Sequence, residues 1–217
     1  MHKPNQWLEA DVRDSLDWDP QLDDSRIVVG ADDGRVTLSG SVPTYFEVAL
    51  ATDDTGAVGG VTAIENQLLV GLVGDAITDA ELAAASADAL DNDRFVPKGA
   101  VTADVLEGFV TLTGQVRHHF QRMAAEHAVG RVDGVLGIDD NVTLTGDPIP
   151  SDVADRIQKA LRRDAVVDDA LIEVTNSGHT IYLDGKTSSI AARSEAEMTA
   201  WQAPGVTEVV DRLEIAP

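Results

Sequence analysis

The chain has 217 residues with 38 acidic and 16 basic side chains, a formal net charge of −22, and no cysteine. Its acidic excess is spread along the whole chain, which excludes general nucleic-acid binding, and the absence of cysteine excludes disulfides and thiol chemistry. No stretch approaches 18 apolar residues, so no membrane-spanning helix is expected. The acidity fits a highly soluble surface or, alternatively, adaptation to a salty interior.

A helix and a β-hairpin are the first elements expected. The helix is indicated by three apolar residues at four-residue spacing: Leu8, Val12 and Leu16. Apolar residues then alternate with polar ones on both sides of a turn at residues 31–34, which predicts two antiparallel strands. Between helix and hairpin lies "DWDPQLDDS", residues 17–25. It predicts a helix end and a turn with Trp18 packed on it; weak cation binding is the alternative, although Pro20 interrupts and no glutamate closes a calcium loop.

A second helix and a last strand complete the first unit. The end of that helix lies in "ATDDTGAVGG", residues 51–60, which carries three glycines. Glycine is a poor helix former, so we expect this helix to be short or frayed. Ile64 and Leu68 mark the strand that follows.

The whole pattern occurs three times. "GRVTLSGSV", starting at residue 34, returns as "GFVTLTGQV" at residue 108, and a further shift gives "GHTIYLDGK" at residue 178. Nine glycines recur at the hairpin turn, at the strand end and before the last strand, and we expect structural roles for them: Gly34, Gly40, Gly60, Gly108, Gly114, Gly134, Gly178, Gly185 and Gly205. A capping box of Thr78 and Glu81, and an N-cap at Ser151 after Pro150, are expected to begin the first helices of the second and third copies.

These elements predict an α+β fold of three tandem αββαβ modules, each a small three-stranded mixed sheet covered by two helices. The expected boundaries are residues 1–73 (module 1), 74–147 (module 2) and 148–217 (module 3). The linkers, near Gly74 and at residues 145–150, are short, and Pro148 and Pro150 stiffen the second, which favours a compact arrangement.

The repeated segments "DGRVTLSGSV…GGVTAIENQLLV", "EGFVTLTGQV…DGVLGIDDNVTL" and "SGHTIYLDGK…PGVTEVVDRLEI" resemble the BON domain, and within it the osmotically inducible proteins. The resemblance covers nearly the whole chain. It implies non-enzymatic modules linked to osmotic stress, envelope integrity and the binding of phospholipid surfaces. It departs in the third copy, where the hairpin glycine is displaced to Gly178.

The stretch "RHHFQRMAAEHAVGR" is the candidate binding site. It gathers six basic or titratable residues around a single acid in a very acidic chain: Arg117, His118, His119, Arg122, His127 and Arg131. We expect a positive patch, strengthened if the histidines protonate near pH 6, which contacts phosphate head groups. The alternative is a helix surface that pairs with acids of another module.

Other chemistry has weaker support. His119 and His127 are eight residues apart, a poor spacing for a shared metal, so no metal site and no cofactor are expected. "KALRR", residues 159–163, suits the end of a helix dipole. No nucleophile motif or phosphate loop occurs, so we expect no catalysis and no small-molecule substrate.

The sequence therefore predicts an osmotic-stress or envelope-stress protein that contacts a phospholipid surface or a client protein. The alternative is a soluble, chaperone-like stress protein that responds to potassium or calcium. The start of the sequence lacks the apolar core of a signal peptide, which indicates a cytoplasmic location, or a periplasmic one if a natural signal peptide precedes it.

Overall fold

A computed structural model describes residues 3–71, 77–163 and 171–216. Module 1 contains α1 (Asn5–Trp18), β1 (Ile27–Asp32), β2 (Arg35–Val42), α2 (Tyr45–Ala57) and β3 (Ala63–Val70), with a short 3-10 turn at Asp24–Arg26. Module 2 contains α3 (Asp79–Asn92), β4 (Val101–Leu106), β5 (Phe109–Val116), α4 (His119–Gly130) and β6 (Gly137–Leu144). Module 3 contains α5 (Val153–Leu161), β7 (Ile172–Ser177), β8 (Thr180–Thr187), α6 (Ile190–Trp201) and β9 (Glu208–Ile215). The predicted αββαβ order is therefore confirmed in each copy.

Each module has its own three-stranded sheet, in the order β1-β2-β3, β4-β5-β6 and β7-β8-β9. The hairpin pair is antiparallel, and the third strand returns parallel to the second. The register is the same in all three: Val29, Ala103 and Val174 lie opposite Leu38, Leu112 and Leu183. The α+β class and the mixed sheets are confirmed.

Three hydrophobic clusters, one per module, form the cores. The central leucine of each hairpin, at positions 38, 112 and 183, is fully buried. The predicted face of the first helix, Leu8, Val12 and Leu16, is buried against the same sheet. Periodicity therefore identified the side of each element that faces its core.

The nine recurrent glycines all adopt positive φ. The reason is clearest at the end of the second strand, at Gly40, Gly114 and Gly185. A Cβ at any of these would lie 2.0–2.1 Å from a backbone carbonyl oxygen of the segment that leads into the neighbouring strand. Only a residue without a side chain allows the two segments to approach this closely.

Three local predictions are wrong. The second helix of module 1 is neither short nor frayed, because α2 has 13 residues and its Gly56 packs against Ile190 of module 3. Trp18 does not pack on the turn but is 87% exposed. The N-cap of α5 is Asp152, one residue after Ser151, and its side chain makes no capping bond. The capping box of Thr78 and Glu81 is confirmed, whereas the linker predicted near Gly74 lies outside the described residues.

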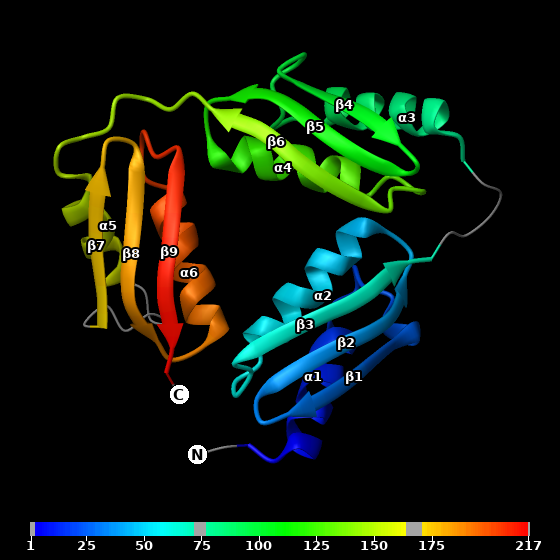
Figure 1. Ribbon diagram of the computed structural model, residues 1–217, viewed down its shortest axis with the longest axis horizontal. Coiled ribbons are helices and arrows are strands. Elements are labelled where there is room, and N and C mark those ends of the chain that lie inside the picture. Colours follow the sequence, from blue (N-terminus) through cyan, green and yellow to red (C-terminus); the bar gives the residue numbers. More distant parts are fainter. Residues whose placement is uncertain (1–2, 72–76, 164–170, 217) are drawn as a thin grey trace.

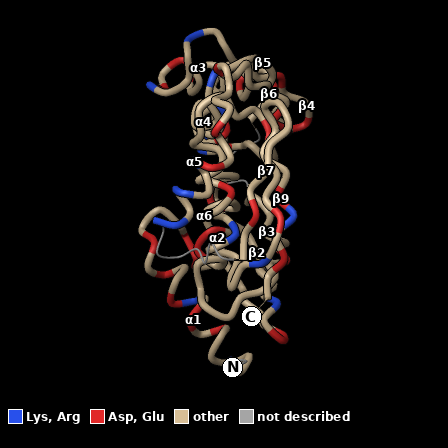
Figure 2. The backbone as a smooth tube through the Cα atoms, turned by 90° about the vertical axis from the view of Figure 1, so that its left-hand side faces the viewer, with Lys and Arg blue, Asp and Glu red and all other residues tan. Residues whose placement is uncertain are grey.

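The second helices α2, α4 and α6 lie towards the centre of the molecule (Figure 1). The three sheets lie on one face of the molecule, and the helices lie on the other (Figure 2). Gly130 at the end of α4 lies close to the backbone of Phe46 in α2, and Gly56 of α2 lies against Ile190 of α6. Acidic positions are distributed over all parts of the backbone, with fewer basic ones between them (Figure 2). The contacts of Gly130 and Gly56 join α2 to the second helices of both other modules.

Candidate functional site

The predicted basic cluster lies at the start of α4 and along it, at the centre of the molecule. The helix start is fixed by Gln121, whose side-chain oxygen accepts hydrogen bonds from the backbone N–H groups of Arg117 and His118, both at 3.0 Å. All six predicted residues are therefore on one short segment. They do not form one open patch, because several of them turn towards the neighbouring modules.

The arginines of the cluster already have partners within the protein. Arg117 pairs with Asp147 at the start of the linker to module 3. The Nε atom of Arg122 lies 3.5 Å from a carboxylate oxygen of Asp140, and its guanidinium lies 5.2 Å from the centre of the Trp201 ring in α6. Arg131 stacks on Phe46 of module 1, with 3.7 Å between the guanidinium carbon and the ring centre. These contacts join module 2 to both neighbours.

Two histidines of the cluster also contact the other modules. The ring of His119 lies 4.1 Å from that of Trp201, and the ring of His127 lies edge-on to Phe46 at 5.3 Å. Burial, and then the charge of Arg122, lowers the pKa of His119 to about 4. Burial, and then Arg131, lowers the pKa of His127. Burial therefore opposes the protonation of both residues, so His119 and His127 are poorer contributors to a positive patch than exposed histidines would be.

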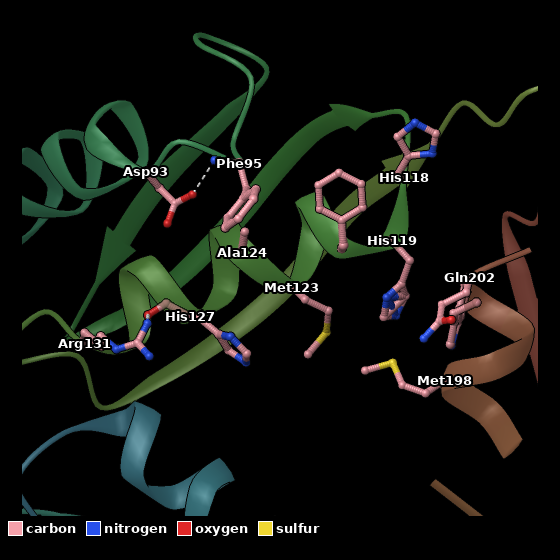
Figure 3. Close-up of a pocket in the computed structure, with 12 residues that line it drawn as sticks. Asp93, Phe95, His118, His119, Met123, Ala124, His127, Arg131, Met198 and Gln202 are labelled. Atoms are coloured by element: carbon pink, nitrogen blue, oxygen red, sulfur yellow. Dashed lines mark hydrogen bonds between the residues drawn. The ribbon is translucent and has the colours of Figure 1, made fainter. Parts of the chain in front are cut away.

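A pocket with a volume of about 630 Å³ opens beside this junction (Figure 3). Its walls come from the loop after α3, from α4 and from α6. They are mainly apolar, and the apolar residues are Phe95, Phe120, Met123, Ala124, Met198 and Trp201. His118, His119, His127, Arg131, Asp93 and Gln202 complete the lining. The pocket therefore brings four of the six predicted residues together with apolar side chains that the sequence analysis did not select.

Four side chains beside the pocket contact one another in a row. Arg94 lies 4.4 Å over the Phe95 ring, Phe95 is edge-on to Phe120 at 6.1 Å, and Phe120 stacks on His118 at 5.5 Å. Phe95 is 47% exposed and Phe120 is 54% exposed. We call these four residues the aromatic rim. It presents apolar surface and basic groups together to solvent.

The other predicted candidates have local roles. In the acidic stretch, Asp19 and Asp23 accept hydrogen bonds from the backbone N–H groups of Gln21 and Ser25, as turn residues do. Lys159 lies in the last turn of α5, where its charge suits the helix dipole. Within the described ranges, no group of three or more His, Asp or Glu residues is arranged to hold a metal ion. No helix in the described parts of the chain combines the length and the apolar character needed to cross a bilayer.

Comparison with known proteins identifies the family. The BON domain model matches residues 4–71, 78–146 and 151–217, and the chain therefore belongs to the BON domain family. This is a family of non-enzymatic stress proteins.

Among individual proteins, the chain is similar to osmotically-inducible protein Y of Escherichia coli (strain K12). The two are 30% identical over 140 residues, which cover 60% of this chain and 68% of the other. Two structures of CdsD, a structural protein of the type III secretion system of Chlamydia trachomatis, cover 96% and 97% of this chain, and 91% and 98% of their own. Both are 15% identical to this chain, with TM-scores of 0.25 and 0.26.

Proposed function

We propose that this chain is a non-enzymatic osmotic-stress protein that binds phospholipid surfaces, and that the aromatic rim is its contact surface. The link to osmotic stress is supported by its similarity to an osmotically inducible protein. The assignment of the binding surface rests on the aromatic rim, the row of contacting side chains beside the pocket: Arg94, Phe95, Phe120 and His118.

The rim has the chemistry of a membrane interface. Aromatic rings prefer the boundary between head groups and acyl chains, where one side is apolar and the other is wet. Basic side chains next to them contact the phosphates of anionic lipids. By contrast, Arg122 is 26% exposed and paired with Asp140, so it serves the junction between modules and is a poor choice for contact with head groups.

Flotation with liposomes tests the proposal. The protein is expected to float with anionic vesicles and not with zwitterionic ones, and less so at moderate salt, because salt screens attraction between exposed charges. The double variant Phe95→Ser, Phe120→Ser should reduce flotation about tenfold, because it removes both apolar anchors. Phe109→Ser is the matched control, since Phe109 is also exposed but lies on β5 outside the pocket lining.

Two results would contradict the proposal: no flotation under any condition, or equal flotation of the double variant and the native protein.

The second candidate function is binding of a client protein. Met123 and Met198 favour it because flexible methionines adapt to varied apolar partners. In that case the protein should suppress aggregation of a chemically unfolded test protein, and the same double variant should lose that effect.

A further inference from the structure

We propose that the pocket between modules 2 and 3 binds one single-chain amphiphile that carries a carboxylate or phosphate head group. This inference rests on the proposed function and deepens it, because it states what the cavity beside the aromatic rim holds. Two features of the pocket support it, the apolar wall and the arginine Arg131.

The apolar wall suits a flexible alkyl chain. Met123 of α4 and Met198 of α6 point towards one another across the pocket (Figure 3), and Trp201 lies on the α6 side. Methionine side chains adjust to chains of irregular shape because they are unbranched and polarisable. The volume of about 630 Å³ lies within the range of about 300–1000 Å³ that is usual for small-molecule sites, which often form between domains.

The charged groups of the lining favour an anion. They are Arg131 and one acid, Asp93, since burial lowers the pKa of the lining residues His119 and His127. The Oδ1 atom of Asp93 already accepts hydrogen bonds from the backbone N–H groups of Phe95 at 2.7 Å and Val96 at 3.3 Å. Because this carboxylate is engaged, the lining favours an anionic head at Arg131 over a cationic one.

Arg131 is the group that would hold the head. Its guanidinium lies over the Phe46 ring and donates a long hydrogen bond of 3.5 Å to the carbonyl oxygen of His127. In the described part of the chain, no carboxylate lies within ion-pairing distance of it. A head group at Arg131 would leave the alkyl chain to lie along Met123 and Met198.

Fluorescence of Trp201 reports on the pocket directly. The chain has three tryptophans, and the other two, Trp7 and Trp18, are exposed and do not line the pocket. In a Trp7→Phe, Trp18→Phe background, dodecanoate and dodecyl phosphate are titrated below their micelle concentrations, with dodecyltrimethylammonium as the cationic counterpart. A saturable one-to-one change with the anions is expected, with binding about fivefold or more tighter than for the cation. The ratio of the two anions shows which head group is preferred.

A matched pair of variants tests the charge without altering the fold. Met198 is 45% exposed, so both Met198→Glu and Met198→Gln are tolerated there. Both variants lose the apolar contact of the methionine, and the glutamine measures that loss alone. The glutamate also places a negative charge in the pocket, so it should bind dodecanoate about fivefold or more weakly than the glutamine of the same shape. Three results would overturn the inference: no saturable change in Trp201 emission with any probe, equal affinity for anion and cation, or equal binding by the two variants.

The two proposals fail separately. Binding of dodecanoate without flotation on anionic vesicles would leave the pocket as a site for a free amphiphile and would refute the membrane contact. Flotation without any response of Trp201 to monomeric amphiphiles would refute the pocket ligand and leave the aromatic rim as the contact surface.

Discussion

At the scale of single residues, the repeated glycines are the strictest requirement of the fold. Gly40 has a φ of +115°, and a Cβ there would lie 2.0 Å from the carbonyl oxygen of Arg26. Gly30, in the neighbouring strand of the same sheet, has open space at the Cβ position and no positive φ. The two glycines therefore differ in what they contribute, although both lie in the same hairpin.

Gly40→Ala should destabilise module 1 by about 2–4 kcal/mol, because the methyl group meets backbone that cannot move away and the conformation is strained. Amide hydrogen exchange across β1 and β2 measures this loss module by module. Gly30→Ala is the control and should change stability by at most about 1 kcal/mol. Equal effects of the two substitutions would mean that close approach is not the reason for the glycine at position 40.

At the scale of elements, α4 differs from its counterparts α2 and α6 because it brings histidine side chains to its contacts with them. It carries His119 against Trp201 and His127 against Phe46, and burial lowers the pKa of both histidines. Asp53 and Asp93 act in the opposite direction on His127, whereas Arg122 and Arg131 reinforce the effect of burial. The stability of the packing around α4 therefore depends on whether His119 and His127 are protonated.

This linkage predicts a loss of stability in mild acid. The pKa of His119 falls from 6.5 to about 4 in the folded protein, so the unfolded chain binds more protons between these values. Stability from this residue is present above pH 6.5, is lost as the pH falls towards 4, and changes no further below that. Thermal unfolding of His119→Gln and the native protein at pH 7 and pH 4.5 measures the difference, which should be smaller in the variant.

A second group must be separated from this effect. Burial, and then Asp19 and Asp53, raises the pKa of Asp54 to about 6, so its contribution to stability increases as the pH falls from 6 towards 3.8. Asp54 is present in both proteins and cancels in the comparison, and Asp54→Asn should steepen the loss in acid. Parallel pH profiles of His119→Gln and the native protein would exclude His119 as the cause.

At the scale of the whole molecule, the three modules are held together by side chains and not by a shared sheet. The Phe46 ring of module 1 contacts both Arg131 and His127 of module 2. The Trp201 ring of module 3 contacts Arg122 and His119 of module 2. Each contact is between a basic or imidazole group of α4 and an aromatic ring of a neighbour. The residues first selected as a head-group patch thus largely form the junction.

Phe46→Ala should loosen module 1 from module 2 by about 1–3 kcal/mol, because it removes an aromatic contact and a cation–π contact together. Small-angle scattering should show a larger radius of gyration, while the circular dichroism of the modules stays the same. Phe109→Ala, on an exposed ring outside the junction, should leave the radius unchanged. An unchanged radius in Phe46→Ala would show that other contacts hold the modules.

The sequence predicts what is local and misses what joins the modules. Alternation and four-residue spacing identified the hairpins and the buried helix faces, because each of these patterns reflects one element packing on its own core. The length of α2 was missed, since the contact of Gly56 with Ile190 comes from another module and outweighs helix propensity. For the same reason the sequence did not identify Phe95, Met198 and Trp201 as pocket residues. They come from different modules, and no spacing pattern in the chain relates them.

The separation of the three sheets has a consequence for how such a chain can arise. Since no described strand of one module bonds to a strand of another, each copy has a hairpin and a core of its own. Its inward helix is then free to diverge, and at one junction a basic helix has come to face aromatic partners and to enclose a cavity. Tandem duplication followed by unequal specialisation of one helix surface accounts for three similar hairpins together with the pocket at α4.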